Sequence, residues 1–108
     1  MQDYQTHSWI FLATALATIN AKADRKSIAM IADGINHAVP TEKEMNTSFK
    51  WLMLHGLIIK KENKYMLTSS GKEYYAAASI HSEHLLDICN KLATTFSKRD
   101  KENSLSTT

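Results

Sequence analysis

Four side chains between residues 81 and 89 form the nearest approach to a metal-binding cluster in the sequence. They are His81, Glu83, His84 and Cys89. Histidines three residues apart share one face of a helix, but a stable metal site needs at least one further ligand on that face. Cys89 lies five residues beyond His84, which turns it onto a different face. We therefore expect no metal at these residues, and no cofactor is expected elsewhere.

Cys89 is the single cysteine of the chain, so an internal disulfide is excluded. Its apolar neighbours Ile88 and Leu92 predict a buried thiol that behaves as a small hydrophobic side chain. A redox-sensing thiol is the alternative. A lone cysteine also fits a reducing compartment, and we expect the protein to be cytoplasmic.

Motifs of catalysis are absent from the sequence. It contains no nucleophile elbow, no glycine-rich phosphate loop, no zinc-protease pair of histidines and no Cys-x-x-Cys. Because each of these supplies a nucleophile, a phosphate cradle or a metal, we expect no enzyme and assign no catalytic residue.

The middle of the chain has the clearest signals of local structure. Thr41 and Glu44 form a capping box, in which each side chain accepts a hydrogen bond from the other residue's backbone N–H, and Pro40 disfavours an earlier helical turn. A helix is predicted over residues 41–55, ended by Gly56 in a left-handed conformation. The apolar residues Met45, Phe49, Leu52 and Met53 share one face, opposite Lys43, Asn46, Thr47 and Lys50.

Two short apolar runs follow this helix, at residues 57–59 and 65–67. Both contain β-forming residues, and the segment between them is polar and rich in lysine. This pattern predicts a hairpin over residues 57–67 with a basic tip. Thr68 can then cap a further helix that begins at Ser69.

These elements carry a resemblance to a known class of proteins. A helix ending in Leu-x-x-x-Gly-Leu-Ile, a charged tip and then Tyr-x-Leu-Thr-x-x-Gly resembles the recognition helix and wing of bacterial winged helix-turn-helix proteins, in the broad class of MarR-like and PadR-like regulators. The resemblance covers residues 27–75 and is carried here by Leu52, Gly56, Leu57, Ile58, Tyr65, Leu67, Thr68 and Gly71. It implies a mainly α fold with a small β-hairpin, as a winged helix-turn-helix with a long C-terminal dimerisation helix.

The resemblance implies that the outward face of the helix 41–55 enters the major groove of double-stranded DNA. In that position Asn46 could pair bidentately with adenine, and the lysines of the face could bind guanine or phosphate. Lysines at the hairpin tip would bind phosphates beside the minor groove. The expected DNA-binding residues are Lys43, Asn46, Thr47, Lys50, Lys60, Lys61 and Lys64.

The charge of the chain leaves an alternative open. Lys and Arg number 13 against 11 Asp and Glu, Glu42 and Glu44 would repel phosphates, and the face itself contains no arginine. The alternative is a winged-helix module that binds protein rather than DNA, through Trp51, Leu54 and His55. An exposed Trp51 would be a candidate hot spot for such binding, whereas a Trp51 covered by the core would remove its best anchor.

The first two helices are predicted over residues 8–20 and 25–37. Nothing basic precedes the first, and its apolar run is too short to span a bilayer, so we expect a core helix rather than a signal peptide or a membrane anchor. Gly34 inside the second implies a close helix contact or an early loosening. Asn36 or His37 is expected to cap its C-terminus.

One long helix is predicted over residues 69–97, with a heptad seam of Tyr74, Ala78, His81, Leu85, Ile88 and Leu92. With the first helix it resembles the dimerisation helices of winged-helix regulators, which implies a homodimer. Protonation of His81 could make dimerisation sensitive to pH. Residues 98–108 lack periodicity and are expected to be a disordered tail. The expected interface consists of Trp9, Leu12, His81, Leu85, Ile88 and Leu92.

A length of 108 residues and a hydrophobic content of 44% predict one domain with a modest core, over residues 1–97. The sequence and the resemblance together imply a small cytoplasmic regulator of transcription that acts as a homodimer on double-stranded DNA. A protein partner is the alternative, and no membrane is expected.

Overall fold

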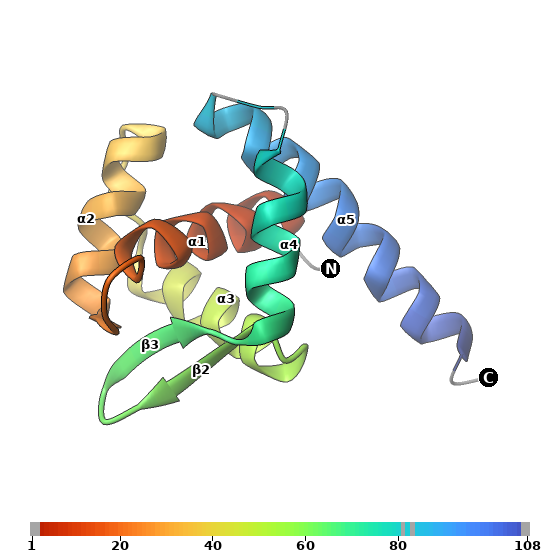
Figure 1. Ribbon diagram of the computed structural model, residues 1–108, viewed down its shortest axis with the longest axis horizontal. Helices are drawn as coiled ribbons and strands as arrows, with labels where there is room; N and C mark the ends of the chain where they lie inside the picture. The colour runs from red at the N-terminus through yellow and green to blue at the C-terminus, as the bar shows by residue number, and fades with distance from the viewer. Residues whose placement is uncertain (1–2, 81, 83, 107–108) are drawn as a thin grey trace.

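The computed structural model describes residues 3–80, 82 and 84–106, without the side chains of residues 103–106. In these residues a mainly helical fold carries a three-stranded antiparallel sheet of order β1-β3-β2 at its lower edge in Figure 1, and the mainly helical character with a small hairpin agrees with the sequence-based prediction at this coarse level. The elements are α1 (Tyr4–Ala17), β1 (Ala23–Asp24), α2 (Arg25–Asn36), α3 (Glu42–Leu54), β2 (Ile58–Lys61), β3 (Lys64–Leu67), α4 (Ser69–Ser79) and α5 (Leu85–Ser106).

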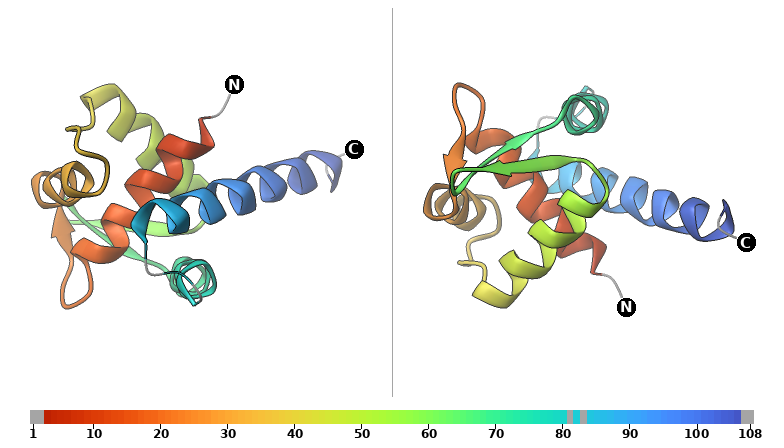
Figure 2. Two further views of the ribbon diagram at one scale, coloured as in Figure 1. Left: turned by 90° about the horizontal axis from the view of Figure 1, so that it is seen from above. Right: turned by 90° about the horizontal axis from the view of Figure 1, so that it is seen from below.

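Helix α1 lies at the centre of the fold. Every residue from His7 to Ala15 is buried, so α1 is covered on all sides rather than along one stripe. Helices α2, α3 and α5 pack around it, and α5 extends beyond them (Figure 2). The helix begins at Tyr4, earlier than predicted, because the Asp3 carboxylate accepts the backbone N–H of Thr6 at 3.0 Å.

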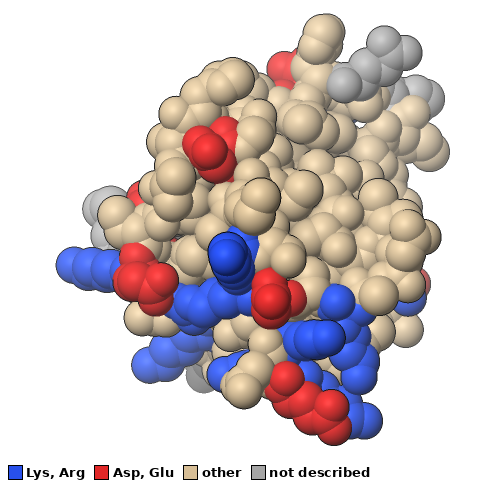
Figure 3. Space-filling view, turned by 90° about the vertical axis from the view of Figure 1, so that its left-hand side faces the viewer, with Lys and Arg blue, Asp and Glu red and all other residues tan. Residues whose placement is uncertain are grey.

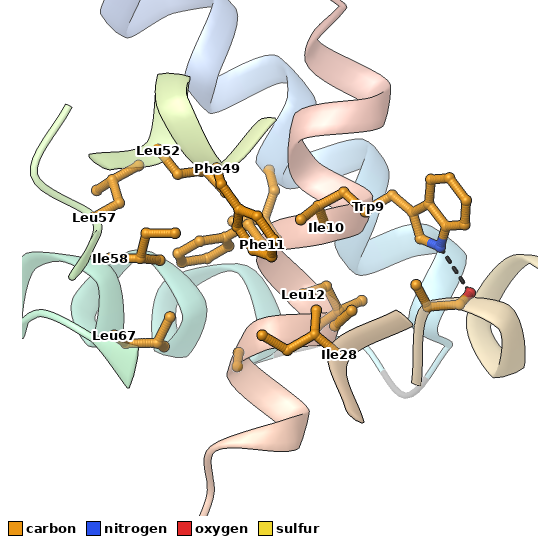
Figure 4. Close-up of a cluster of buried hydrophobic side chains, with 14 of the residues drawn as sticks. Trp9, Ile10, Phe11, Leu12, Ile28, Phe49, Leu52, Leu57, Ile58 and Leu67 are labelled. Atoms are coloured by element: carbon orange, nitrogen blue, oxygen red, sulfur yellow. Dashed lines mark hydrogen bonds between the residues drawn. The ribbon is translucent and has the colours of Figure 1, made fainter. Parts of the chain in front are cut away.

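The core joins α1 to the helices and strands around it. Phe11 is fully buried, and the side chains of Phe49 and Ile58 gather around it (Figure 4). On another side of α1, the indole N–H of Trp9 donates to the carbonyl of Ala32 at 2.8 Å, which satisfies a buried donor and fixes α2 against α1.

The turn between α2 and α3 follows the local signals of the sequence. His37 adopts φ 54° and its N–H donates to the carbonyl of Asp33 at 2.7 Å, so it caps α2 as expected. The predicted capping box is present: the N–H of Glu44 donates to Thr41 Oγ1 at 3.0 Å, and Glu44 Oε1 accepts the N–H of Thr41 at 2.8 Å. Gly34 makes no close helix contact and α2 does not loosen there, so neither expectation for it was right.

The predicted hairpin is confirmed, and its tip is a two-residue turn. Glu62 and Asn63 have φ of 54° and 65°, the conformation of a type I′ turn, and Lys61 pairs with Lys64 across it. Strand β1 was not predicted. Its two residues pair with Tyr65 and Lys64 of β3, and a strand of that length carries no periodicity from which it could be recognised.

A compact junction connects the end of α3 to the start of α4. The Thr68 hydroxyl donates to the carbonyl of Gly56 at 2.6 Å and accepts the N–H of Gly71 at 3.0 Å, while the Thr68 N–H donates to the carbonyl of Leu57 at 3.0 Å. A Cβ on Gly71 would lie 2.1 Å from the Leu57 carbonyl oxygen. The spacing of threonine and glycine after the second strand is therefore a packing requirement.

The prediction of a single helix over residues 69–97 was wrong. The structure has α4 and α5 instead, with the chain reversing direction between them (Figure 1). This reversal brings Leu92 and Phe96 into the core, where Phe96 meets Phe11 edge to face at 5.4 Å between ring centroids. One straight helix would leave these side chains in water, so burial overrides the heptad pattern.

The prediction of a disordered tail was also wrong for residues 98–106. Helix α5 continues to Ser106, and Arg99 and Asp100 make hydrogen bonds to other helices. Residues 107–108 lie outside the described part of the chain. Among the helices that the structure describes, none has the length and apolar character needed to cross a membrane.

Substitution of Gly71 by alanine tests the junction. We expect Gly71→Ala to lower the free energy of unfolding by about 1–3 kcal/mol, because its Cβ would overlap the Leu57 carbonyl group. This group belongs to the backbone, so it cannot move aside as the end of a flexible side chain can. Gly34→Ala is the matched control, since a Cβ there meets nothing within 4 Å and alanine favours the helix by about 1 kcal/mol. Chemical denaturation should order the variants accordingly. Equal stability of the two would contradict this account of Gly71.

Candidate functional site

The two faces of α3 differ sharply in exposure. Its inner face is buried against the core, including Met45, Phe49 and Leu52. Because this face is held in place, the rotation of α3 about its axis is fixed. The outer face is in solvent and carries all four polar residues predicted for it, Lys43, Asn46, Thr47 and Lys50.

An arginine joins this outer face from another helix. Arg25, the first residue of α2, donates from Nη2 to Glu42 Oε2 at 3.0 Å and to Asn46 Oδ1 at 2.5 Å. Its guanidinium carbon lies 5.4 Å from the ring centroid of Phe49. Helical periodicity placed no arginine on this face, because Arg25 and its partners are far apart in the chain.

The hairpin adds further cations beside α3. Its lysines Lys60, Lys61 and Lys64 are exposed, as predicted. Lys60 Nζ lies 5.8 Å from the ring centroid of Tyr65, and that ring stacks on Phe49 of α3 at 4.1 Å. The stacked rings of Phe49 and Tyr65 therefore couple the hairpin to α3 and set their relative position.

Cations are unevenly distributed over the molecule. The sequence has no Lys or Arg between residues 27 and 42 or between 73 and 90, whereas residues 22–26, 43–50 and 60–64 contain eight. Figure 3 shows Lys and Arg gathered on the lower part of one face, with Asp and Glu among them, and a mostly uncharged upper part. We define the basic region as the eight cations on α3, around the start of α2 and on the hairpin, namely Lys22, Arg25, Lys26, Lys43, Lys50, Lys60, Lys61 and Lys64. The other five cations, Lys72, Lys91, Lys98, Arg99 and Lys101, lie on α4 and α5.

Trp51 belongs to the core. Its side chain is 4% exposed and lies between two histidine rings, stacked on His7 at 4.9 Å and tilted against His55 at 4.1 Å between centroids. His7 is itself buried, with Nδ1 2.8 Å from the hydroxyl oxygen of Ser48. Leu54, by contrast, is 79% exposed. The best anchor of the alternative protein-binding site is thus inaccessible to a partner.

The end of α5 holds the C-terminal end of α3. Arg99 donates to the carbonyl of His55 at 3.1 Å and to the hydroxyl of Tyr74 at 2.7 Å. Asp100 accepts the Tyr4 hydroxyl at 2.6 Å and lies 3.5 Å from His55 Nε2. The hydrogen bond to Asp100 raises the pKa of Tyr4 to about 12. Helices α1, α3 and α5 therefore meet at one polar cluster.

Both histidines of this cluster have lowered pKa values. Burial is the main cause at His7, where His55 also lowers the pKa and Asp3 and Asp100 oppose the shift. Burial again dominates at His55, where Arg99 adds to it and Asp100 opposes it. Burial disfavours the charged imidazolium, so the folded state favours the neutral form of both rings.

The predicted dimer interface is largely part of the core of the single chain. Four of its residues are buried against this chain's own helices, namely Trp9, Leu12, Ile88 and Leu92. Their burial needs no second copy. Trp9 and Leu12 lie on the central helix α1, and the reversal after α4 turns Ile88 and Leu92 of α5 toward the core. Leu85 is 38% exposed, and His81 lies outside the described residues.

No group of His, Cys, Asp and Glu able to hold a metal occurs in the described part of the chain. His81 and Glu83 of the cluster considered from sequence fall outside that part, while His84 is exposed and Cys89 is buried. Burial raises the pKa of the Cys89 thiol to about 11. Since the thiolate is the reactive form, this environment suits an inert packing role rather than a redox sensor.

Comparisons with known proteins add no relative. No protein-family model matches the chain, no curated protein matches it, and no solved structure matches it. The surface of α3, Arg25 and the hairpin has therefore to be interpreted from its own geometry.

The buried histidines predict a pH dependence of stability. Because their pKa values are lower in the folded state, the unfolded chain binds protons first as the pH falls below the ordinary value of 6.5. The two neutral rings should therefore make their whole contribution to the free energy of unfolding above about pH 7. The free energy of unfolding should fall as the pH is lowered from 6.5.

We expect His7→Gln to weaken this dependence between pH 7.5 and 5.5, a window in which ordinary carboxyl groups stay ionised. His84→Gln, at an exposed position, is the control and should keep it. Denaturant titrations at several pH values provide the measurement. Parallel pH profiles for His7→Gln and His84→Gln would show that His7 is not the group responsible.

Proposed function

We propose that the protein is a small DNA-binding regulator of transcription, with a winged helix-turn-helix fold in which α3 enters the major groove and the β2–β3 hairpin is the wing. The order of elements supports this proposal, since two helices joined by a short turn are followed directly by an antiparallel hairpin. The observation that carries it is the basic region, in which cations from α2, α3 and the hairpin meet on one side of the molecule.

The dimensions of α3 fit the proposed role. Its 13 residues span about 20 Å, and the major groove of B-DNA, about 12 Å wide, admits a helix. Lys43, Asn46, Thr47 and Lys50 face outward together, so they would meet base edges and nearby phosphates. The hairpin lysines would neutralise phosphates, which supplies affinity without selecting sequence.

The protein-binding alternative has less support. It depends on a surface around Trp51, Leu54 and His55, yet only Leu54 of these is well exposed. A single exposed leucine is normal for a soluble protein and does not define an interface. We therefore favour DNA over a protein as the partner of α3.

A homodimer remains part of the proposal, on different residues from those expected. Apolar side chains at the junction of α4 and α5 are exposed, with Ile80 at 71%, Leu85 at 38% and Leu86 at 56%. They lie in the part of the sequence that has no Lys or Arg, so two copies would meet there without repulsion between cations. We also propose a cytoplasmic location, because the DNA of a bacterial regulator is in the cytoplasm and a single free cysteine fits its reducing environment.

Removal of two cations from the outer face of α3 tests the assignment. We expect Lys43→Ala with Lys50→Ala to weaken specific binding by about 1–3 kcal/mol and to reduce the salt dependence by about 0.9 in log–log slope for each phosphate that the protein no longer neutralises. Binding to a pool of mixed genomic duplex fragments, titrated with salt, gives both quantities.

The matched control is Lys91→Ala with Lys98→Ala, which removes the same charge from α5. It should bind like the parent. If the two double variants have the same affinity and the same slope, the outer face of α3 is not the DNA contact.

A further inference from the structure

The contact between Arg25 and Asn46 fixes the direction of the Asn46 amide. A guanidinium has only donors, so the atom that faces it, 2.5 Å from Nη2, has to be the amide oxygen Oδ1. The NH₂ group of Asn46 then lies on the other arm of the carboxamide. The side chain thus has one end engaged within the protein and one donor end available.

Arg25 is held in position from several directions. Glu42 Oε2 accepts from the same Nη2 at 3.0 Å, and the ring of Phe49 lies beneath the guanidinium. Asp24 caps α2 directly before it, accepting the Ser27 N–H at 2.8 Å. The Arg25 side chain is only 32% exposed. An arginine held in this way loses less conformational freedom on binding than a lysine in free solvent.

The pair offers donors to an approaching molecule. The hydrogen bonds that Arg25 makes with the described residues all start from Nη2, so the N–H groups of Nη1 and Nε are available to donate to a ligand. The cation beside Oδ1 makes this oxygen a poorer acceptor for a second donor and polarises the amide toward donation. Lys43 and Lys50, on the same face, are donors only.

We propose that Arg25 and Asn46 act together to recognise guanine in the major groove. This inference rests on the proposed DNA-binding function and deepens it. Guanine presents two acceptors there, N7 and O6, whereas adenine pairs its N7 acceptor with an N6 amino donor. Donors on Arg25 and Asn46 therefore match the guanine edge, whereas on adenine one of them would face the N6 amino group, which is also a donor. The pairing of Asn46 with adenine, expected from the sequence, is thereby replaced.

Glu42 is a positioning residue in this arrangement. Its carboxylate is 83% exposed and orients Arg25 through the salt bridge, at the cost of repulsion toward phosphates. The same glutamate that counted against DNA binding in the sequence therefore has a role in selectivity. It would hold the guanidinium over α3 before DNA arrives.

Selection from a random duplex library, followed by affinity measurements on the enriched duplex, tests the inference. The parent and Lys26→Ala should enrich guanine, and replacing that guanine by 7-deazaguanine, which lacks the N7 acceptor, should weaken their binding about 10-fold. For Arg25→Ala the same replacement should change the affinity less than about 3-fold. Lys26 is the matched control for base preference, because it is the next residue, is exposed and carries the same charge. As part of the basic region it contributes to overall affinity, so Lys26→Ala shares any general loss of binding with Arg25→Ala and should differ from it only in keeping the preference for guanine.

A second variant guards against loss of folding. Arg25→Lys keeps the charge but not the planar fork, so it should keep the salt dependence of the parent while its preference for guanine becomes weaker than the parent's. Failure of the parent to bind any duplex at low salt would refute the proposed function itself. Binding with no enrichment of guanine, or with equal base preferences in Arg25→Ala and Lys26→Ala, would overturn only the role of Arg25 and Asn46.

Discussion

The burial of α1 on every side is the constraint on which the rest of the structure depends. A helix whose residues from His7 to Ala15 are all buried has to be surrounded. In a chain of 108 residues, each helix that packs against α1 has one face buried by that contact. Helix α3 gives its inner face to α1, so its outer face is left to solvent with a fixed orientation. The position of the candidate site is thus a consequence of how the core is completed.

The return of α5 toward α1 completes the same core and adds a polar element to it. Phe96 contacts Phe11 and Trp51, with centroids 5.4 and 5.1 Å apart, and Arg99 reaches the carbonyl at the end of α3. The hydrogen bonds of Arg99 start from Nη1 and Nη2, while its buried Nε has no hydrogen-bond partner among the described residues. The C-terminal half of α5 therefore holds the C-terminal end of α3 in place.

Local signals in the sequence were sufficient for the part of the fold that depends on neighbouring residues. The capping box of Thr41 and Glu44, the left-handed Gly56 and the hairpin were all predicted, because each is decided within a few residues. The polar residues of the outer face of α3 followed from helical periodicity alone. For these elements, local preference and the final packing agree.

Contacts between distant residues were not predictable in the same way. The heptad pattern pointed to one helix, but the burial of Leu92 and Phe96 against α1 is worth more than helical continuity. The link from Arg25 to Asn46 spans 21 residues, and one position in the sequence at the start of α2 gives no sign of it. The buried position of Trp51 between two histidines also depends on α1, which the pattern of α3 does not contain.

The central claim is that DNA contacts the outer face of α3, Arg25 and the hairpin together. The most direct test is a two-dimensional amide NMR spectrum of the labelled protein, titrated with mixed-sequence duplex at low salt. The account predicts that shifts concentrate at residues 25–26, 42–50 and 60–64, while those at 85–98 remain unchanged. Shifts confined to α5, or no shift at any duplex concentration, would contradict it.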